Sequence, residues 1–207
     1  MARLKVGVLI SGRGSNLQAL LDACADPAFP AEIALVISNV PGAHGLDRAE
    51  KAGVPTLTID HKDFPDRASF DARMDQSLRA AGIELVCLAG FMRLLSDGFV
   101  EGWRGRMINI HPSLLPSFKG LRTHAQALAA GVKLHGCTVH YVTPSLDDGP
   151  IIAQGAVPVL EGDSEESLAE RVLAVEHRIY PLALRMIAEG GAPGADPAVS
   201  LINPPPS

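Results

Sequence analysis

The feature that most constrains the fold is an alternation of short apolar runs with segments of helical periodicity. Apolar runs of four to six residues between glycines or turn residues are typical of buried strands, and apolar residues at 3–4 spacing indicate helices. We expect strands at residues 6–10, 33–37, 56–59, 84–89 and 106–110 and helices at 15–25, 44–52 and 64–81. This order predicts a parallel sheet with right-handed crossovers and helices on its faces.

The second half of the chain has a different pattern. A helix is expected at 123–130, followed by a strand at 137–142 and an antiparallel partner at 151–160. Ser164 should cap a long helix that ends near residue 188. From residue 190 the chain is rich in Gly, Ala and Pro, so we expect an extended or poorly ordered tail. The sequence therefore predicts one α/β domain at 1–189 and a tail at 190–207.

Composition excludes several classes of protein. At 207 residues the chain fits one domain, and its formal net charge of −5 provides no basic surface for nucleic acid. The three cysteines are far apart and lack the spacing of a zinc site, so we interpret them as reduced thiols of a cytoplasmic protein. No apolar stretch approaches the roughly 18 residues that span a membrane. We therefore expect no metal, no nucleic-acid partner and no membrane contact.

The run from Asn109 to Pro116 carries the strongest chemical signal. Asn109 and His111 stand two residues apart at the end of an apolar segment, so on a strand they point to the same side. Pro112 then ends the strand, because it has no N–H for a sheet ladder. The ends of strands in open α/β sheets are where ligands bind. An amide donor beside an imidazole suits the stabilisation of a developing oxyanion.

An isolated Asn-x-His pattern more often only anchors a loop, but this run is longer and resembles a known signature. Asn-Ile-His-Pro-Ser-Leu-Leu-Pro, followed by Gly120, is similar to the signature of the folate-dependent formyltransferases. The run Leu-Asp-Asp-Gly-Pro-Ile at 146–151 resembles the aspartate loop of the same family. The run Ser-Gly-Arg-Gly-Ser-Asn-Leu at 11–17 narrows the resemblance to members that act on phosphoribosylglycinamide. The resemblance is collinear from about residue 4 to about residue 189 and implies a single-domain Rossmann-like formyltransferase fold, with a mostly parallel central sheet and antiparallel strands in the C-terminal half.

The glycine loop at 12–16 suits either a tight turn with a serine cap or an anion site at the start of a helix. It is neither a dinucleotide fingerprint nor a P-loop. The resemblance implies that Gly14, Ser15 and Asn16 hold the substrate phosphate and that Glu176 binds the ribose hydroxyls. From the residues alone, Glu176 could equally be an exposed side chain on the long helix, and Arg13 could be a solvated surface charge.

The resemblance also implies a catalytic set made of Asn109, His111 and Asp147. A carboxylate beside His111 favours the imidazolium, which can stabilise an oxyanion. Asp148 departs from the small residue expected at its position. We expect it to point to solvent, although it could instead complicate which Asp pairs with His111. Thr138 and His140 share one face of their strand and lie near the active site by resemblance, although a core histidine is equally expected at position 140.

A folate pocket is the last implication of the resemblance. An apolar slot beside backbone polar groups suits a flat heterocycle. Without the resemblance, the apolar members would be assigned to the core and Arg67 to a solvated helix surface. The implied folate contacts are Arg67, Met92, Arg93, Leu94, Leu95, Asn109, Thr143, Pro144, Ser145, Leu146 and Asp147.

The expected reaction moves the formyl group of 10-formyltetrahydrofolate to the amine of phosphoribosylglycinamide, a step of purine biosynthesis. The substrate amine is the nucleophile, which fits a sequence without a Ser-His or Cys-His signature. The expected assembly is a monomer or a homodimer. One alternative is a deformylase that passes the formyl group to water, although such enzymes carry an extra N-terminal domain. A transfer-RNA formyltransferase would carry a C-terminal RNA-binding domain. A non-catalytic nucleotide-binding protein on the same scaffold is the third alternative.

Overall fold

The computed structural model describes residues 2–190 and 201–202, which belong to two compact units, residues 1–109 and 110–207. The first unit contains a parallel sheet whose strands are ordered β3-β2-β1-β4-β5. This order is that of a doubly wound sheet, in which the strand order reverses at the neighbouring parallel strands β1 and β4. The strands are β1 (Leu4–Ile10), β2 (Ala31–Ser38), β3 (Thr56–Thr58), β4 (Leu85–Leu88) and β5 (Met107–His111). The last two residues of β5, Ile110 and His111, belong to the second unit.

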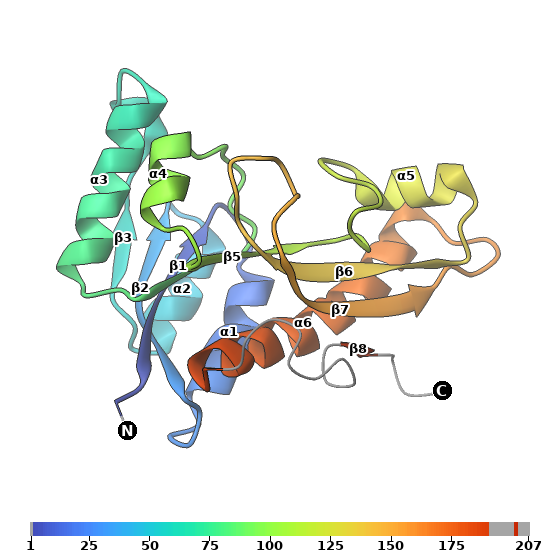
Figure 1. Cartoon of the computed structure of the whole chain (residues 1–207), viewed down its shortest axis with the longest axis horizontal. Coiled ribbons are helices and arrows are strands. Elements are labelled where there is room, and N and C mark those ends of the chain that lie inside the picture. The colour runs from blue at the N-terminus through green and yellow to red at the C-terminus, as the bar shows by residue number, and fades with distance from the viewer. Residues whose placement is uncertain (1, 191–200, 203–207) are drawn as a thin grey trace. The chain divides into compact units, whose positions relative to one another are not determined.

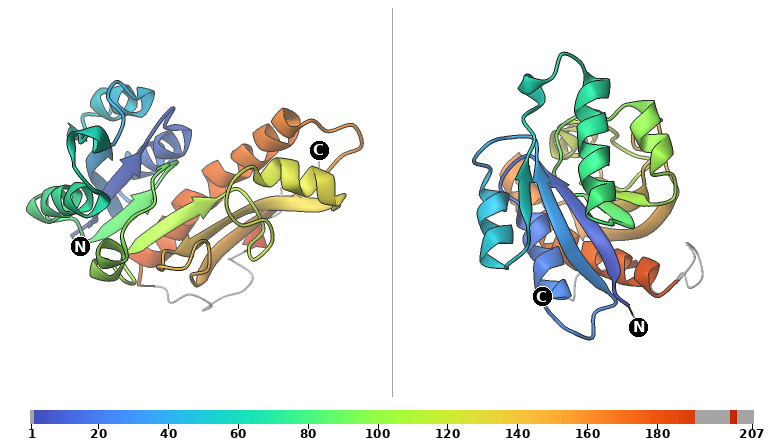
Figure 2. Two further views of the ribbon diagram at one scale, coloured as in Figure 1. Left: turned by 90° about the horizontal axis from the view of Figure 1, so that it is seen from above. Right: turned by 90° about the vertical axis from the view of Figure 1, so that its left-hand side faces the viewer.

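Helices cover both faces of the first sheet. Figure 2 shows α1 and α2 on one face and α3 and α4 on the other, and each pair of helices is in contact. Helix α1 buries Leu17, Leu20, Leu21 and Cys24, which is the apolar face that its 3–4 spacing predicts. The helical elements are α1 (Ser15–Cys24), α2 (His44–Lys51), the 3₁₀ turn η1 (His61–Asp63), α3 (Arg67–Ala80) and α4 (Asp97–Gly102).

Two helices of this unit differ from the prediction. Helix α3 begins at Arg67 and not at residue 64, because the Asp66 carboxylate accepts a hydrogen bond from the Ser69 N–H and so caps the helix there. Helix α4 was not predicted, since six residues are too few to show a helical period. Ser96 caps it by accepting from the Phe99 N–H.

The second unit is built on an antiparallel pair, β6 (Leu134–Tyr141) and β7 (Ile151–Pro158). The long helix α6 (Glu165–Ala188) contacts both strands, and α5 (Thr123–Ala130) contacts α6 (Figure 1). Ser164 and Ser167 form a reciprocal capping box at the start of α6. A two-residue strand, β8 (Leu201–Ile202), pairs with β7 in parallel.

The predicted fold class is confirmed, because a parallel sheet flanked by helices precedes an antiparallel pair. The predicted tail at 190–207 lies outside the described residues, apart from Gly190 and the strand β8. Within the part of the chain that the structure describes, no helix has the length and apolarity needed to cross a membrane.

Candidate active site

Side chains at the carboxyl ends of the first unit's strands form a hydrogen-bonded network. Ser11, just after β1, donates to the Asn39 side-chain oxygen over 2.6 Å, and Asn39 follows β2. The Met92 N–H, beyond β4, donates to the Ser11 hydroxyl over 2.8 Å. The Asn39 amide nitrogen lies 3.3 Å from Nδ1 of His61. Sequence reasoning missed this network, because His61 carries no spacing signal and its partners come from separate strand ends.

The glycine loop packs tightly against the start of α2. Gly14 has a φ of +70°, and a Cβ at this position would lie 2.6 Å from the Gly45 Cα. The Gly45 N–H donates to the Gly12 carbonyl over 3.0 Å, and Arg48 Nε donates to the Arg13 carbonyl over 2.9 Å. Gly14 therefore satisfies two demands that a side chain would break, a left-handed φ and a close backbone contact.

Helix α1 begins directly after this loop with Ser15 and Asn16. Its N-cap residue is Gly14, so no side chain caps the first turn. Backbone N–H groups in a first turn are suited to bind an anion, and the helix dipole favours negative charge there. Arg13 is exposed, in agreement with a surface position.

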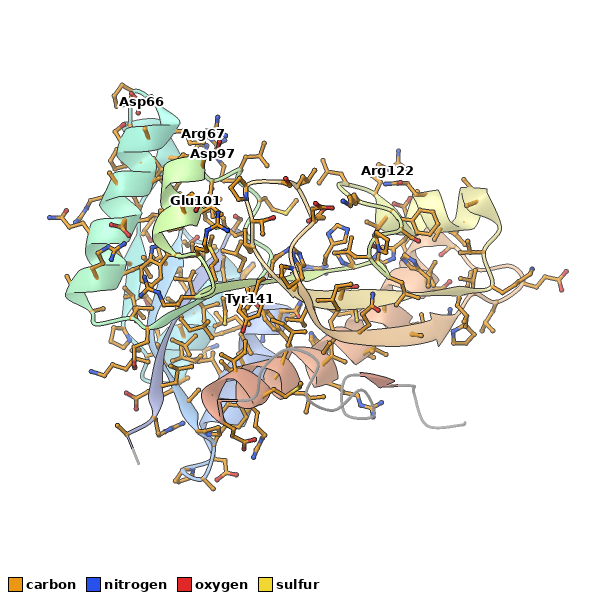
Figure 3. All side chains as sticks on the ribbon, viewed as in Figure 1. Asp66, Arg67, Asp97, Glu101, Arg122 and Tyr141 are labelled. Carbon is orange, nitrogen blue, oxygen red and sulfur yellow. The ribbon has the colours of Figure 1, made fainter. Side chains whose placement is uncertain are left out.

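The predicted folate segment after β4 is on the surface and not in the core. The exposed fraction is 69% for Met92 and 68% for Leu94, so the core interpretation is wrong for both. Arg93 is also exposed, while Leu95 is half-buried. Arg67 is exposed at the first position of α3, where Figure 3 labels it. Neighbouring large apolar side chains left exposed are a feature of binding surfaces.

His111 is buried at the end of β5 with an acceptor at each ring nitrogen. Its Nε2 lies 3.1 Å from the Phe118 carbonyl oxygen, and its Nδ1 lies 3.5 Å from a carboxylate oxygen of Asp147. A neutral imidazole has one N–H and can serve only one of these acceptors, whereas the imidazolium serves both. Asn109 lies on the same strand, paired in register with Leu88 of β4.

Asp147 is held in a restricted conformation. Its φ is +48°, which is uncommon for a residue other than glycine, and its side chain is 8% exposed. The oxygen that faces His111 also accepts a hydrogen bond from the Gly120 N–H over 2.9 Å. Asp148 is exposed, as expected, but it also forms an ion pair with Lys119. The geometry therefore assigns Asp147, and not Asp148, as the partner of His111.

The two supporting residues on β6 are both buried. The Thr138 hydroxyl donates to the Ser113 carbonyl over 2.7 Å and accepts from the Leu115 N–H over 3.0 Å, so it fixes the turn after His111. Nδ1 of His140 lies 2.9 Å from the Tyr141 carbonyl oxygen, and its Nε2 lies 3.9 Å from the second oxygen of Asp147. Burial lowers the pKa of His140, against the opposing effects of the Tyr141 carbonyl and Asp147.

His124 and His135 form a pair next to the Phe118 ring. Nδ1 of His124 lies 3.2 Å from Nε2 of His135, and the Phe118 ring meets the His135 ring edge-on with 5.8 Å between centroids. Burial, and secondarily the charge of His124, lower the pKa of His135 to about 4. His135 is therefore neutral at physiological pH and supports the segment whose carbonyl faces His111.

Glu176 is buried on α6, so its interpretation as an exposed side chain is wrong. Burial, and secondarily the charge of Glu176, raise the pKa of the Cys137 thiol. In the loop after β6, Leu146 is 58% exposed and Pro144 and Ser145 are exposed, while Thr143 is half-buried. Among the described residues, no group of three or more His, Cys, Asp or Glu side chains could hold a metal ion.

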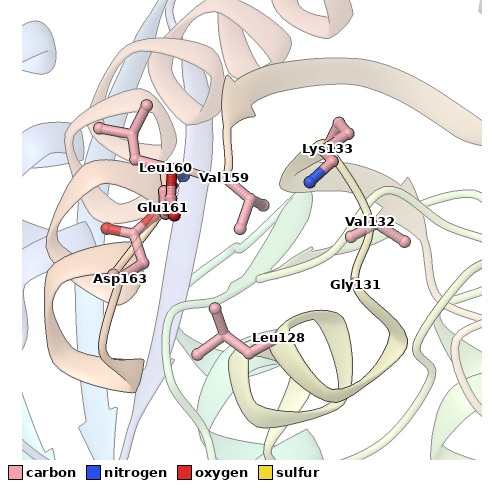
Figure 4. A pocket seen from close by; sticks show the side chains of 9 residues that line it. Leu128, Gly131, Val132, Lys133, Val159, Leu160, Glu161 and Asp163 are labelled. Carbon is pink, nitrogen blue, oxygen red and sulfur yellow. Dashed lines mark hydrogen bonds between the residues drawn. The ribbon is translucent and has the colours of Figure 1, made fainter.

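A separate surface hollow of the second unit lies where α5 and β7 end (Figure 4). Its lining combines apolar side chains with Lys133, Glu161 and Asp163. Asp163 is already engaged, because both of its oxygens accept from the Arg171 guanidinium. No predicted site residue lines this hollow.

The chain is similar to a known protein family and to proteins of similar length. The family model described as "Formyl transferase" matches residues 4–184. A phosphoribosylglycinamide formyltransferase of Escherichia coli is 46% identical over 187 residues, which cover 90% of this chain and 88% of that protein. The solved glycinamide ribonucleotide transformylase 1 of Symbiobacterium toebii is 54% identical with a TM-score of 0.89, and the match covers 91% of this chain and 89% of that one.

Larger proteins are also similar over one segment. The trifunctional purine biosynthetic protein adenosine-3 of Bos taurus is 55% identical over 188 residues. These residues cover 91% of this chain but only 19% of that relative, so the chain spans about a fifth of its length. The family model and the full-length matches agree on one assignment. The chain belongs to the formyl transferase family, and its bacterial relatives of similar length are phosphoribosylglycinamide formyltransferases.

Proposed function

We propose that the chain transfers the formyl group of 10-formyltetrahydrofolate to the amine of phosphoribosylglycinamide in purine biosynthesis. The single observation that carries this proposal is the position of His111 between the Phe118 carbonyl and the Asp147 carboxylate. In this proposal the buried ring acts as an imidazolium, which is suited to stabilise an oxyanion that forms and disappears within one turnover. Family membership supplies the donor, because the related enzymes use a formyl-folate.

The reaction needs no enzyme nucleophile. The substrate amine attacks the formyl carbon, a carbon–nitrogen bond forms, and the carbonyl oxygen becomes negative. The imidazolium of His111 and the amide of Asn109 stabilise this oxygen. The bond between the formyl carbon and N10 of the folate then breaks, N10 takes up a proton, and the amine loses one. Asp147 keeps His111 charged and assists removal of the amine proton through water.

The other predicted residues serve binding in this proposal. Gly14, Ser15 and Asn16 take the substrate phosphate at the uncapped start of α1, and buried Glu176 takes the ribose hydroxyls. The exposed apolar side chains of Met92, Leu94 and Leu146 offer a surface to the folate ring. The remaining folate contacts are Arg67, Arg93, Leu95, Thr143, Pro144 and Ser145. Thr138 and His140 hold the turn after β5 and the second oxygen of Asp147.

We further infer a cytoplasmic enzyme made of one catalytic domain at 1–189, which acts as a monomer or a homodimer. Its three cysteines are buried. Burial raises the pKa of the Cys24 thiol to about 11, which makes this thiol unreactive at neutral pH.

A folate-absorbance assay tests the proposal. Release of tetrahydrofolate from 10-formyltetrahydrofolate is followed with and without phosphoribosylglycinamide. We expect turnover only when the ribonucleotide is present. Equal turnover without it would mean that water accepts the formyl group, and the chain would then be a deformylase. Binding of the ribonucleotide without any turnover would instead indicate a non-catalytic protein.

A further inference from the structure

Two adjacent carboxylates meet two adjacent loop residues in the second unit. The Gly120 N–H donates to Asp147 over 2.9 Å, and the preceding Lys119 forms an ion pair with Asp148. The side chains of Asp147 and Asp148 differ strongly in exposure, at 8% and 57%. The Gly120–Asp147 hydrogen bond is therefore buried beside His111. The Lys119–Asp148 ion pair involves the adjacent residues and lies at the surface.

The loop that presents Lys119 has an unfavourable backbone. Phe118 and Arg122 have φ angles of +54° and +55°, a left-handed region that is unfavourable for residues other than glycine. Such conformations persist only where surrounding contacts fix them. The Phe118 carbonyl is the group that faces Nε2 of His111. Contacts that hold this loop therefore also hold the catalytic histidine.

The 143–149 loop also contains a residue other than glycine with a left-handed φ. Asp147, with its φ of +48°, joins β6 to β7 next to Asp148. The Lys119 ammonium, from outside the loop of Asp148, pairs with the Asp148 carboxylate and lowers its pKa. The ion pair thus links the loop that carries the Phe118 carbonyl with the loop that carries the Asp147 carboxylate. These are the two acceptors of His111.

We propose that Lys119 and Asp148 are positioning residues, which clasp the 118–122 loop to the 143–149 loop and so keep both acceptors of His111 in place. The expected effect of this clasp on kcat rests on the proposed function. Its effect on the two loops, which it holds together, does not. Both side chains are partly exposed, so the pair contributes little to global stability. Its effect is local, and salt screens it.

The test compares wild type with K119M, D148N and the charge-swapped double variant K119D/D148K. We expect each single variant to lose about three- to fivefold in kcat, because an exposed ion pair is worth at most about that factor. The KM for the ribonucleotide should not change, since its proposed contacts lie elsewhere. The swapped variant should return kcat to within about twofold of wild type. High salt should slow wild type but not D148N.

A second readout does not depend on activity. Amide hydrogen exchange of the 118–122 peptide should be about three- to fivefold faster in D148N than in wild type, with unchanged melting temperature. E165Q is the matched control, because Glu165 pairs over 3.3 Å with Arg122, which Figure 3 labels on the same loop, and Glu165 belongs to α6 rather than to the aspartate loop. We expect less than a twofold change in that variant.

The outcomes separate the two proposals. If kcat and exchange in D148N match wild type, or if the swapped variant is no better than the single variants, the clasp is wrong. Equal effects in E165Q and D148N would also contradict it, because any ion pair of the loop would then suffice. If wild type shows no formyl transfer at all, the proposed function fails, and the exchange measurement still decides whether the clasp exists.

Discussion

The two units hold their predicted site residues by different means. In the first unit, the glycine loop is fixed by backbone contacts, with Gly14 lying against Gly45 and the Gly45 N–H bound to the Gly12 carbonyl. In the second unit, His111 is fixed by polar groups, the Phe118 carbonyl and the Asp147 carboxylate. The first arrangement is sensitive to added volume, and the second to charge. Substitutions in the two units should therefore fail in different ways.

The largest effect is expected from removing the charge beside His111. D147N should reduce kcat about 100–1000-fold, the usual loss when an oxyanion-stabilising arrangement is broken, because His111 loses the carboxylate that keeps it charged. Steady-state formyl transfer measures this loss. D148N is the matched control, since it changes the adjacent carboxylate, and it should lose only the few-fold expected for the clasp. A greater loss in D148N than in D147N would reverse the assignment of the two residues.

The next largest effect is expected from adding a side chain to the glycine loop of the first unit. G14A and G42A both place a side chain at similar φ angles, +70° and +68°, but only at Gly14 would the new Cβ meet backbone. Both changes carry the left-handed penalty of about 1–2 kcal/mol. G14A should lower the free energy of unfolding by on the order of 2 kcal/mol more and raise the KM for the ribonucleotide. Urea unfolding and substrate titration measure both quantities.

Equal stability of G14A and G42A would show that the contact with Gly45 is not limiting. In that case the KM of G14A would still report on the phosphate site separately.

The charge sensitivity of the second unit also predicts a pH dependence. The pKa of His135 is about 4 in the folded protein against 6.5 for an ordinary histidine. As pH falls through this window the unfolded chain binds the proton first, so stability is lost and is not regained at lower pH. Wild type should lose about 2 kcal/mol more than H135Q between pH 7 and about pH 4.5 by urea unfolding. Parallel curves for the two proteins would remove His135 as the cause.

The smallest effect on stability is expected at the exposed apolar residues. M92A and L94A should change the free energy of unfolding by less than about 0.5 kcal/mol, because both side chains are largely in solvent. The same variants should raise the KM for 10-formyltetrahydrofolate several-fold if these side chains contact the folate. L17A, in the buried face of α1, is the control, and it should destabilise by about 2–5 kcal/mol. An unchanged KM in M92A and L94A would remove both residues from the folate site.

Periodicity predicted the elements of the fold because each buries one apolar face. The spacing of Leu17, Leu20 and Leu21 requires a helix with those residues inward, and the structure buries all three. The short helix α4 was missed because it is fixed by the Ser96 cap rather than by a repeat of apolar residues. A single capping serine without an apolar repeat behind it is too weak a local signal to predict a helix.

The resemblance predicted which residues form the candidate site. It did not predict the contacts that hold those residues in place. The resemblance pointed to His111 and Asp147, which lie 3.5 Å apart although 36 positions separate them. Nothing in the sequence indicated that Phe118 would turn its carbonyl to His111, because that depends on a left-handed φ at a non-glycine residue. The Lys119–Asp148 ion pair could not be predicted either, because no sequence pattern relates these two distant positions.

The most direct test of the account follows a labelled formyl group in wild type and H111A. Both proteins receive saturating ribonucleotide and folate carrying a ¹³C formyl group, and single-turnover samples are analysed by mass spectrometry. We predict that wild type places the label on the ribonucleotide amine and that H111A does so about 100–1000-fold more slowly while still binding the folate. A rate in H111A close to that of wild type, or label recovered as formate in wild type, would contradict the account.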